Sequence, residues 1–183
     1  MRGIAAEAGV AVPTLELRFG TKARLLKAAI DVAIAGDDEP VSVLDRAWAK
    51  EAVAAGTGAG LLAAAAAVVT AAQERSAGLV LAVFEGASVD PELAQLAAQM
   101  TAQRAATAEW LVDALSRIAP LREDRQEAIE TLWILMDPAL FDRLTRQRHW
   151  TSERYQRWFA RSAECLLVSD ISADTSRSGR TSP

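Results

Sequence analysis

Apolar residues recur every three or four positions along most of the chain, and this spacing predicts α-helices. The clearest stripe near the C-terminal end is Ile129, Leu132, Trp133 and Met136, which follow the i, i+3, i+4, i+7 pattern of one helix face. Glycine and proline mark where the helices end. The expected helices span residues 4–8, 13–19, 21–35, 43–53, 60–75, 79–87, 91–118, 122–136 and 151–168, with a break or kink at 76–78. No alternating run of strand length stands out, so the predicted fold class is all-α.

Residues 3–29 combine two short helices around a tight turn with a third helix that follows at once. Gly9 ends the first helix, because glycine adopts the left-handed cap conformation without a Cβ penalty. Pro13 suits the first position of the second helix, and Thr21 is a good N-cap for the third. In the second helix, apolar residues are expected to pack inward and polar residues to face outward, Leu15, Leu17 and Phe19 in the first group and Thr14, Glu16 and Arg18 in the second.

This order of helix, glycine turn and helix is the helix-turn-helix pattern, although an ordinary helical corner shares the same spacing. The blocks at residues 4–10 (IAAEAGV), 12–15 (VPTL), 19–22 (FGTK) and 25–26 (LL) resemble the DNA-binding region of TetR-family transcriptional regulators. The resemblance implies an all-helical homodimer with an N-terminal DNA-binding head and a larger effector-binding body. The family usually has an aromatic residue where this chain has Glu16. It also has a complete helix before the motif, so we expect Met1 to be an internal methionine of a longer natural protein.

Five residues are the candidates for contact with DNA. If the second helix enters a major groove, Pro13 and Thr14 lie nearest the base edges, and the Thr14 hydroxyl can bond a base or a phosphate. Arg18 and Lys22 are expected to neutralise phosphates, and the resemblance gives a lysine at the position of Lys22 as a recurrent phosphate contact. Glu16 either accepts a hydrogen bond from cytosine or leaves a backbone contact missing.

The charge distribution fits a molecule that binds DNA at one end. The chain has a net charge of −4, yet residues 1–36 carry +2 and the remainder −6. A basic head on an acidic body is typical of such a protein, although an excess this small also arises by chance. We therefore predict double-stranded DNA as a partner of the head alone.

Composition along the chain predicts three parts. Residues 1–36 form the helix-turn-helix head, with its first helix missing. The acidic stretch 36–40 ends in proline and marks the boundary. Residues 41–168 form a helical ligand-binding and dimerisation domain, and 169–183 a disordered tail. The apolar run 61–72 is shorter than the roughly 20 residues of a membrane span. With no visible signal peptide, we expect a buried helix in a cytoplasmic protein without a membrane partner.

The body is expected to hold a small-molecule effector among the helices of residues 60–118. Its candidate contacts are Phe84, Glu85, Met100, Trp110 and Trp133. An apolar lining favours a hydrophobic molecule, although large apolar residues more often belong to a core. Glu85 interrupts an apolar run, so it either binds the effector, caps a neighbouring helix or points to water.

The last two long helices carry wide, aromatic-rich stripes. In TetR-like proteins the corresponding helices pair with those of a second copy, so the resemblance implies a homodimer interface here. Its expected members are Ile129, Leu132, Trp133, Met136, Tyr155, Trp158, Phe159 and Leu166. The alternative is that both stripes pack in the core of the chain itself.

These patterns together predict a DNA-binding transcriptional regulator, a ligand-responsive repressor that binds a palindromic operator as a homodimer. A ligand in the body is expected to change the tilt of the helix at residues 21–35. The alternative is a truncated helical dimerisation module that does not bind DNA. An enzyme ranks behind both, because His149 is the single histidine and Cys165, the single cysteine, reads as a core residue. Neither a metal site nor a cofactor is predicted.

Overall fold

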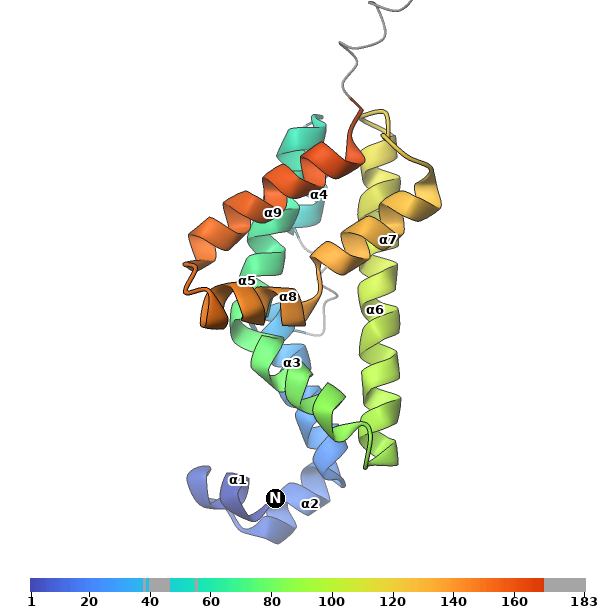
Figure 1. The fold of residues 1–183 in the computed structure, drawn as a ribbon. Coiled ribbons are helices and arrows are strands. Elements are labelled where there is room, and N and C mark those ends of the chain that lie inside the picture. The colour runs from blue at the N-terminus through green and yellow to red at the C-terminus, as the bar shows by residue number, and fades with distance from the viewer. Residues whose placement is uncertain (38, 40–46, 55, 170–183) are drawn as a thin grey trace, which may run out of the picture.

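The computed structural model describes residues 1–37, 39, 47–54 and 56–169, and it confirms the all-α class. No strand occurs among these residues, only an isolated bridge between Leu121 and Val168. Two short helices lie at one end, and one longer helix leads from them into a larger bundle (Figure 1). The helices are α1 (Arg2–Glu7), α2 (Val12–Phe19), α3 (Lys22–Ala35), α4 (Ala47–Ala54), α5 (Gly58–Gly86), α6 (Pro91–Ser116), α7 (Arg125–Leu135), α8 (Pro138–Asp142), the π-helical turn η2 (Arg143–Gln147) and α9 (Ser152–Leu167).

Side-chain caps begin most of the longer helices. The Thr21 hydroxyl accepts a hydrogen bond from the Arg24 N–H, and Thr151 starts α9 in the same way. Asp90 caps α6 through the N–H of Glu92 at 2.9 Å. The Thr21 cap lies where the sequence predicted it, and α6 and α9 begin within one residue of their expected starts at 91 and 151. Asp124 caps α7, which therefore begins three residues after the expected start at 122.

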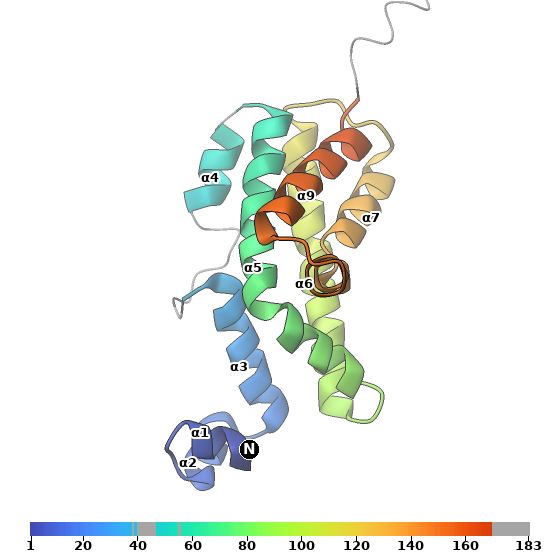
Figure 2. The ribbon, with the colours of Figure 1, turned by 60° about the vertical axis from the view of Figure 1, so that its left-hand side comes forward.

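Of the break or kink predicted at residues 76–78, the break is wrong, because α5 runs without interruption from Gly58 to Gly86, although the helix is bent along its length in Figures 1 and 2. Glycine inside a helix costs only about 1 kcal/mol, which tertiary packing can offset. Ala77 and Val80 are buried, and the Ser76 hydroxyl donates to the Ala72 carbonyl of its own helix at 2.7 Å. By length and composition α5 is the one helix among the described residues that could cross a membrane. In this fold it is the central helix, in contact with α3, α4, α6, α8 and α9.

Two hydrophobic cores hold the bundle together. The larger core joins α5 and α6 to α7, α8 and α9, and its largest fully buried side chains include Leu61, Leu111, Leu132, Tyr155 and Phe159. Figure 2 shows α9 lying across α5 beside α7.

The smaller core attaches α3 to the body. Ile30 of α3 is 2% exposed and packs with Val80 and Val83 of α5 and with Leu96 and Met100 of α6. The packing therefore continues across the boundary expected after residue 36, and α3 belongs to the head at its start and to the body at its end.

Several predictions concern residues at the edges of the described ranges. Residues 38 and 40 of the expected boundary, residues 43–46 of the helix expected at 43–53, and residues 170–183 of the expected tail lie outside the described part of the chain. Ser169, the first residue of that expected tail, is held against the body. Its N–H donates to the Pro120 carbonyl and its hydroxyl to the Leu121 carbonyl, both at 3.0 Å.

Candidate functional site

The head consists of α1, α2 and the start of α3, which are joined by two tight turns. Gly9 takes a φ of 65° after α1, and the Val10 N–H donates back to the Ala5 carbonyl at 3.0 Å. Gly20, with a φ of 74°, separates α2 from α3. Ala5, Leu15 and Ala23 are the buried residues of this end, one from each helix, and α2 contacts both α1 and α3. The glycines supply the positive φ that these tight connections require.

The five predicted DNA contacts, Pro13, Thr14, Glu16, Arg18 and Lys22, are all exposed in the structure. The prediction for Leu17 is wrong, since its side chain is 91% exposed. Residues two positions apart lie on opposite sides of an α-helix, so Leu15 and Leu17 cannot share one buried face. Leu15 is buried and Phe19 half-buried, and Leu17 projects on the outer surface of α2 with the polar side chains.

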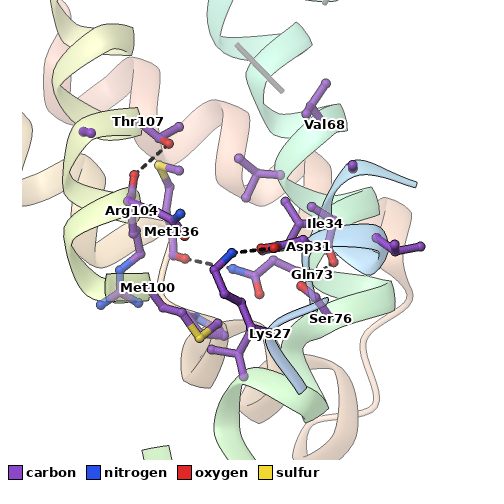
Figure 3. A pocket seen from close by; sticks show the side chains of 18 of the residues that line it. Lys27, Asp31, Ile34, Val68, Gln73, Ser76, Met100, Arg104, Thr107 and Met136 are labelled. Atoms are coloured by element: carbon purple, nitrogen blue, oxygen red, sulfur yellow. Dashed lines mark hydrogen bonds and ion pairs between the residues drawn. The ribbon is translucent and has the colours of Figure 1, made fainter. Parts of the chain in front are cut away.

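A cavity of about 810 Å³ lies in the body between α3, α4, α5 and α6. This volume is within the range of small-molecule sites. Figure 3 shows Met100, Arg104 and Thr107 of α6 on one side of it and residues of α3 and α5 on the other. Its apolar lining includes Ile34, Trp48, Val68, Val69, Val80, Phe84, Met100, Leu111 and Met136. Its polar lining includes Lys27, Asp31, Asp37, Glu39, Gln73, Ser76, Gln103, Arg104 and Thr107.

The predicted effector contacts divide between the cavity and other places. Phe84 and Met100 line the cavity, as expected. Trp110 is not part of the lining, and its ring packs edge-on against Trp48 with the centroids 5.9 Å apart. Trp133 lies under the Arg104 guanidinium, 4.2 Å from its ring centroid. Glu85 is exposed and outside the lining, so the structure places it at the surface.

Buried polar contacts join the cavity wall to the end of α7. The Gln73 amide nitrogen donates to the Met136 carbonyl at 2.8 Å. Arg104 donates to the Asp137 carboxylate at 2.7 Å, and its Nε is buried without a hydrogen-bond partner among the described residues. On the opposite wall, Lys27 pairs with Asp31 within α3. None of these polar residues was predicted; the one available signal was Gln73 and Ser76 interrupting a long apolar run.

The predicted dimer interface is wrong for most of its members. Ile129, Leu132, Met136, Tyr155 and Phe159 are at most 9% exposed within a single chain, so they have almost no surface to offer a second copy. The stripe of α9 faces α5 and α7 instead, which is the alternative that the sequence left open. Three members keep accessible surface: Trp133 and Trp158 are half-buried, and Leu166 is 47% exposed.

The single cysteine and the single histidine both lie at the surface. Cys165 is exposed, which corrects the prediction that it belongs to the core. His149 is exposed too and takes a φ of 56° just before α9. Within the described ranges, no group of three histidine, cysteine, aspartate or glutamate side chains is placed to hold a metal ion.

Comparisons with known proteins do not extend this picture. No family model matches the sequence, and no curated protein or solved structure matches it either. The likeness to TetR regulators therefore rests on the residues of the head quoted above.

Proposed function

We propose that the chain is a DNA-binding transcriptional regulator of the TetR type, a ligand-responsive repressor that binds a palindromic operator as a homodimer. The observation that carries the proposal is the head, where α2 follows α1 across a glycine turn and presents Pro13, Thr14 and Arg18 to solvent. A helix held in this way can enter a major groove with its N-terminal residues toward the base edges. Lys22, exposed at the start of α3, is positioned to neutralise a phosphate.

The regulatory part of the proposal rests on α3, because this helix has two different neighbours. Its first residue follows the turn after α2, and six of its later residues line the cavity, among them Lys27, Asp31 and Ile34. A molecule in the cavity therefore contacts the helix that carries the head. Binding of that molecule and of DNA are coupled if the two ligands favour different positions of α3.

The homodimer is proposed through the outward faces of α7 and α9. Ile134 and Leu166 are 58% and 47% exposed, and Trp158, Arg161 and Cys165 border a hollow beside Leu166. Trp158 and Leu166 both line this hollow on the surface of α9, and apolar side chains gathered at a surface hollow are typical of a contact site. Light scattering of the purified chain measures its mass in solution directly. Leu166→Glu is expected to shift that mass toward the monomer, whereas Val89→Glu, at an even more exposed apolar position on the α5–α6 turn, is the matched control.

Fluorescence anisotropy with the duplex flanking the chain's own gene tests DNA binding. We expect affinity that falls steeply with salt and depends on sequence. Lys22→Ala should reduce the slope of log K against log salt by about 1, whereas Lys50→Ala, an exposed lysine on α4, should leave it unchanged.

A chain that does not bind any duplex across the salt series refutes the proposal. That outcome favours the alternative, a helical module that dimerises and does not bind DNA. Equal loss of slope in Lys22→Ala and Lys50→Ala would place the DNA on a general basic surface and not on the head.

A further inference from the structure

The outward face of α7 is acidic. Glu127, Glu130 and Ile134 follow the i, i+3, i+7 spacing of one helix face, and all three side chains are exposed. The buried residues of the helix, such as Leu132, lie on the opposite side. The Glu130 carboxylate accepts a hydrogen bond from the Gln126 amide of its own helix, and among the described residues neither carboxylate forms an ion pair. We call Glu127 and Glu130 the acidic row.

The outward face of α9 is basic. Arg154, Arg157 and Arg161 have the same spacing and are exposed, while the buried stripe of this helix faces α5 and α7. Glu153 and Glu164 border this face on one side, since successive residues of a helix are about 100° apart. We call Arg157 and Arg161 the basic row. Neither arginine forms an ion pair with a described residue, so their N–H groups are available to a carboxylate of another molecule.

The two helices form one layer of the body and run antiparallel. α7 packs against α6 and α9 against α5, and the two helices also contact each other (Figures 1 and 2). Leu121, which precedes α7, bridges to Val168, which follows α9. At the other end, the Leu135 carbonyl of α7 accepts a hydrogen bond from Tyr155 of α9. Residues near the middle of one helix are therefore level with residues near the middle of the other.

The acidic and basic rows lie near the middle of their helices, so they are level with each other across the layer. A second copy can cover this layer through a two-fold axis in one of two directions. An axis parallel to the helices lays α9 of each copy over α7 of the other, so the basic row meets the acidic row. An axis across the helices lays each helix over its own copy, so arginine meets arginine. Like charges placed opposite each other disfavour association, so the charges select the first arrangement.

We propose that a second copy of the chain docks on this layer with its α9 over α7, and that the acidic row of each copy pairs with the basic row of the other. Two-fold symmetry forms every pair twice. Ile134 and Leu166, 58% and 47% exposed, add apolar surface at opposite ends of the layer. The inference rests on the proposed function only for the homodimer, since it needs neither DNA nor an effector.

Sedimentation equilibrium of the full chain tests the pairing through charge reversal. The double variant Arg157→Glu, Arg161→Glu makes the basic row acidic, and Glu127→Lys, Glu130→Lys makes the acidic row basic. Each places like charges opposite each other, so the dissociation constant of its dimer should rise at least about tenfold. The chain with all four substitutions has its charges exchanged, so it should dimerise again with nearly the affinity of the parent. All four positions are exposed, and circular dichroism checks that each variant keeps its helices.

General repulsion between acidic chains predicts a different result. The parent carries a net charge of −4, so repulsion of this kind would be relieved by the two lysines and the dimer would become tighter. Arg2→Glu, Lys50→Glu is the control, because it changes the net charge as much as the arginine variant does, at exposed positions on α1 and α4. Its dissociation constant should match that of the parent. Rising salt should weaken the parent dimer and strengthen association of the two reversed variants.

The outcomes separate this inference from the proposed function. A dimeric parent whose dissociation constant neither reversal changes overturns the inference and leaves the proposed homodimer in place, and reversals that the fourfold variant does not repair overturn it too. A monomeric parent overturns both the inference and the homodimer. If Arg157→Glu, Arg161→Glu then loses affinity for duplex DNA, the basic row belongs to nucleic acid instead. A dimer that shows these charge effects and ignores every duplex supports the inference and refutes the proposed regulator.

Discussion

Tyr155 packs against the C-terminal end of α7 and forms a hydrogen bond there. Its replacement by phenylalanine tests this contact of the larger core. The side chain is fully buried, and its hydroxyl donates to the Leu135 carbonyl at 3.2 Å. The ring meets Phe141 edge-on with the centroids 4.9 Å apart. Carbonyls in the last turn of a helix lack partners within the helix, so this hydroxyl and the Gln73 amide supply two of them from neighbouring helices.

Tyr155→Phe keeps the ring and removes one hydrogen bond, leaving the buried Leu135 carbonyl without this donor. The free energy of unfolding should fall by about 1–3 kcal/mol at neutral pH, the cost of an unsatisfied buried polar group. Urea denaturation followed by circular dichroism measures it. Ser88→Ala is the matched control: its exposed hydroxyl also bonds a carbonyl, that of Glu85, and its loss should change stability by no more than about 0.5 kcal/mol.

The same residue predicts a specific pH dependence. Burial raises the pKa of Tyr155 well above its ordinary value, and the charge of Asp137 raises it further. The pKa is then higher in the folded than in the unfolded chain. The contribution of the neutral Tyr155 side chain to the free energy of unfolding is therefore complete below pH about 10, and above that pH it falls by up to about 1.4 kcal/mol per pH unit. Tyr155→Phe should lack this loss.

Tyr155 is the only tyrosine in the chain, so tyrosinate absorbance reports it alone. Absorbance is expected to stay low in the folded chain at pH values where the chain in urea has already titrated. Titration of the folded chain at the ordinary pKa, or Tyr155→Phe as stable as the parent, would refute the reasoning.

Three further predictions follow from other parts of the fold. Phe159→Ala should lower the free energy of unfolding by about 3–5 kcal/mol, whereas Leu166→Ala, measured as a monomer, should lower it by less than about 0.5 kcal/mol. Equal losses in urea denaturation would contradict the assignment of Phe159 to the core and of Leu166 to the surface. Asp124→Ala removes the cap of α7 and should cost about 1 kcal/mol, which Asp124→Asn should largely avoid. The hydrogen bond from Arg125 lowers the pKa of Asp113, so in Arg125→Ala a carboxyl NMR titration should show that pKa rising toward its ordinary value; an unchanged midpoint would exclude the pair.

The ends of the helices could be predicted from the sequence because they depend on local chemistry. Thr21, Asp90 and Thr151 cap the helices that follow them, and Gly9 and Gly36 take positive φ values where helices stop. The break at residues 76–78 failed for the opposite reason. Helix propensity is a weak local preference, and the packing of α5 against five other helices outweighs it.

What lies opposite a buried face could not be read from its periodicity. The stripes of α7 and α9 correctly indicate buried faces, but a spacing of three and four fits a partner helix of the same chain as well as one of a second copy. The polar lining of the cavity could not be predicted from the sequence for a similar reason. Lys27 and Asp31 are an i, i+4 pair of the kind that usually lies on a solvated face, and only the arrangement of α3 against α5 and α6 turns them toward a cavity.

The position of Ile30 gives α3 the form of a lever. Ile30 is taken as the pivot because it is the most deeply buried residue of α3 in the smaller core, against which Leu26 and Ile34 also pack. Ile34 lines the cavity as well, and Lys22 begins the helix at the other end. At 1.5 Å of rise per residue, Ile34 lies about 6 Å from this pivot and Lys22 about 12 Å. If α3 tilts rigidly about Ile30, a displacement of Ile34 by an occupant of the cavity is doubled at Lys22 and reversed in direction. Because two half-sites of an operator tolerate little change in spacing, such a tilt in both copies of a dimer is sufficient to release DNA under the proposed function.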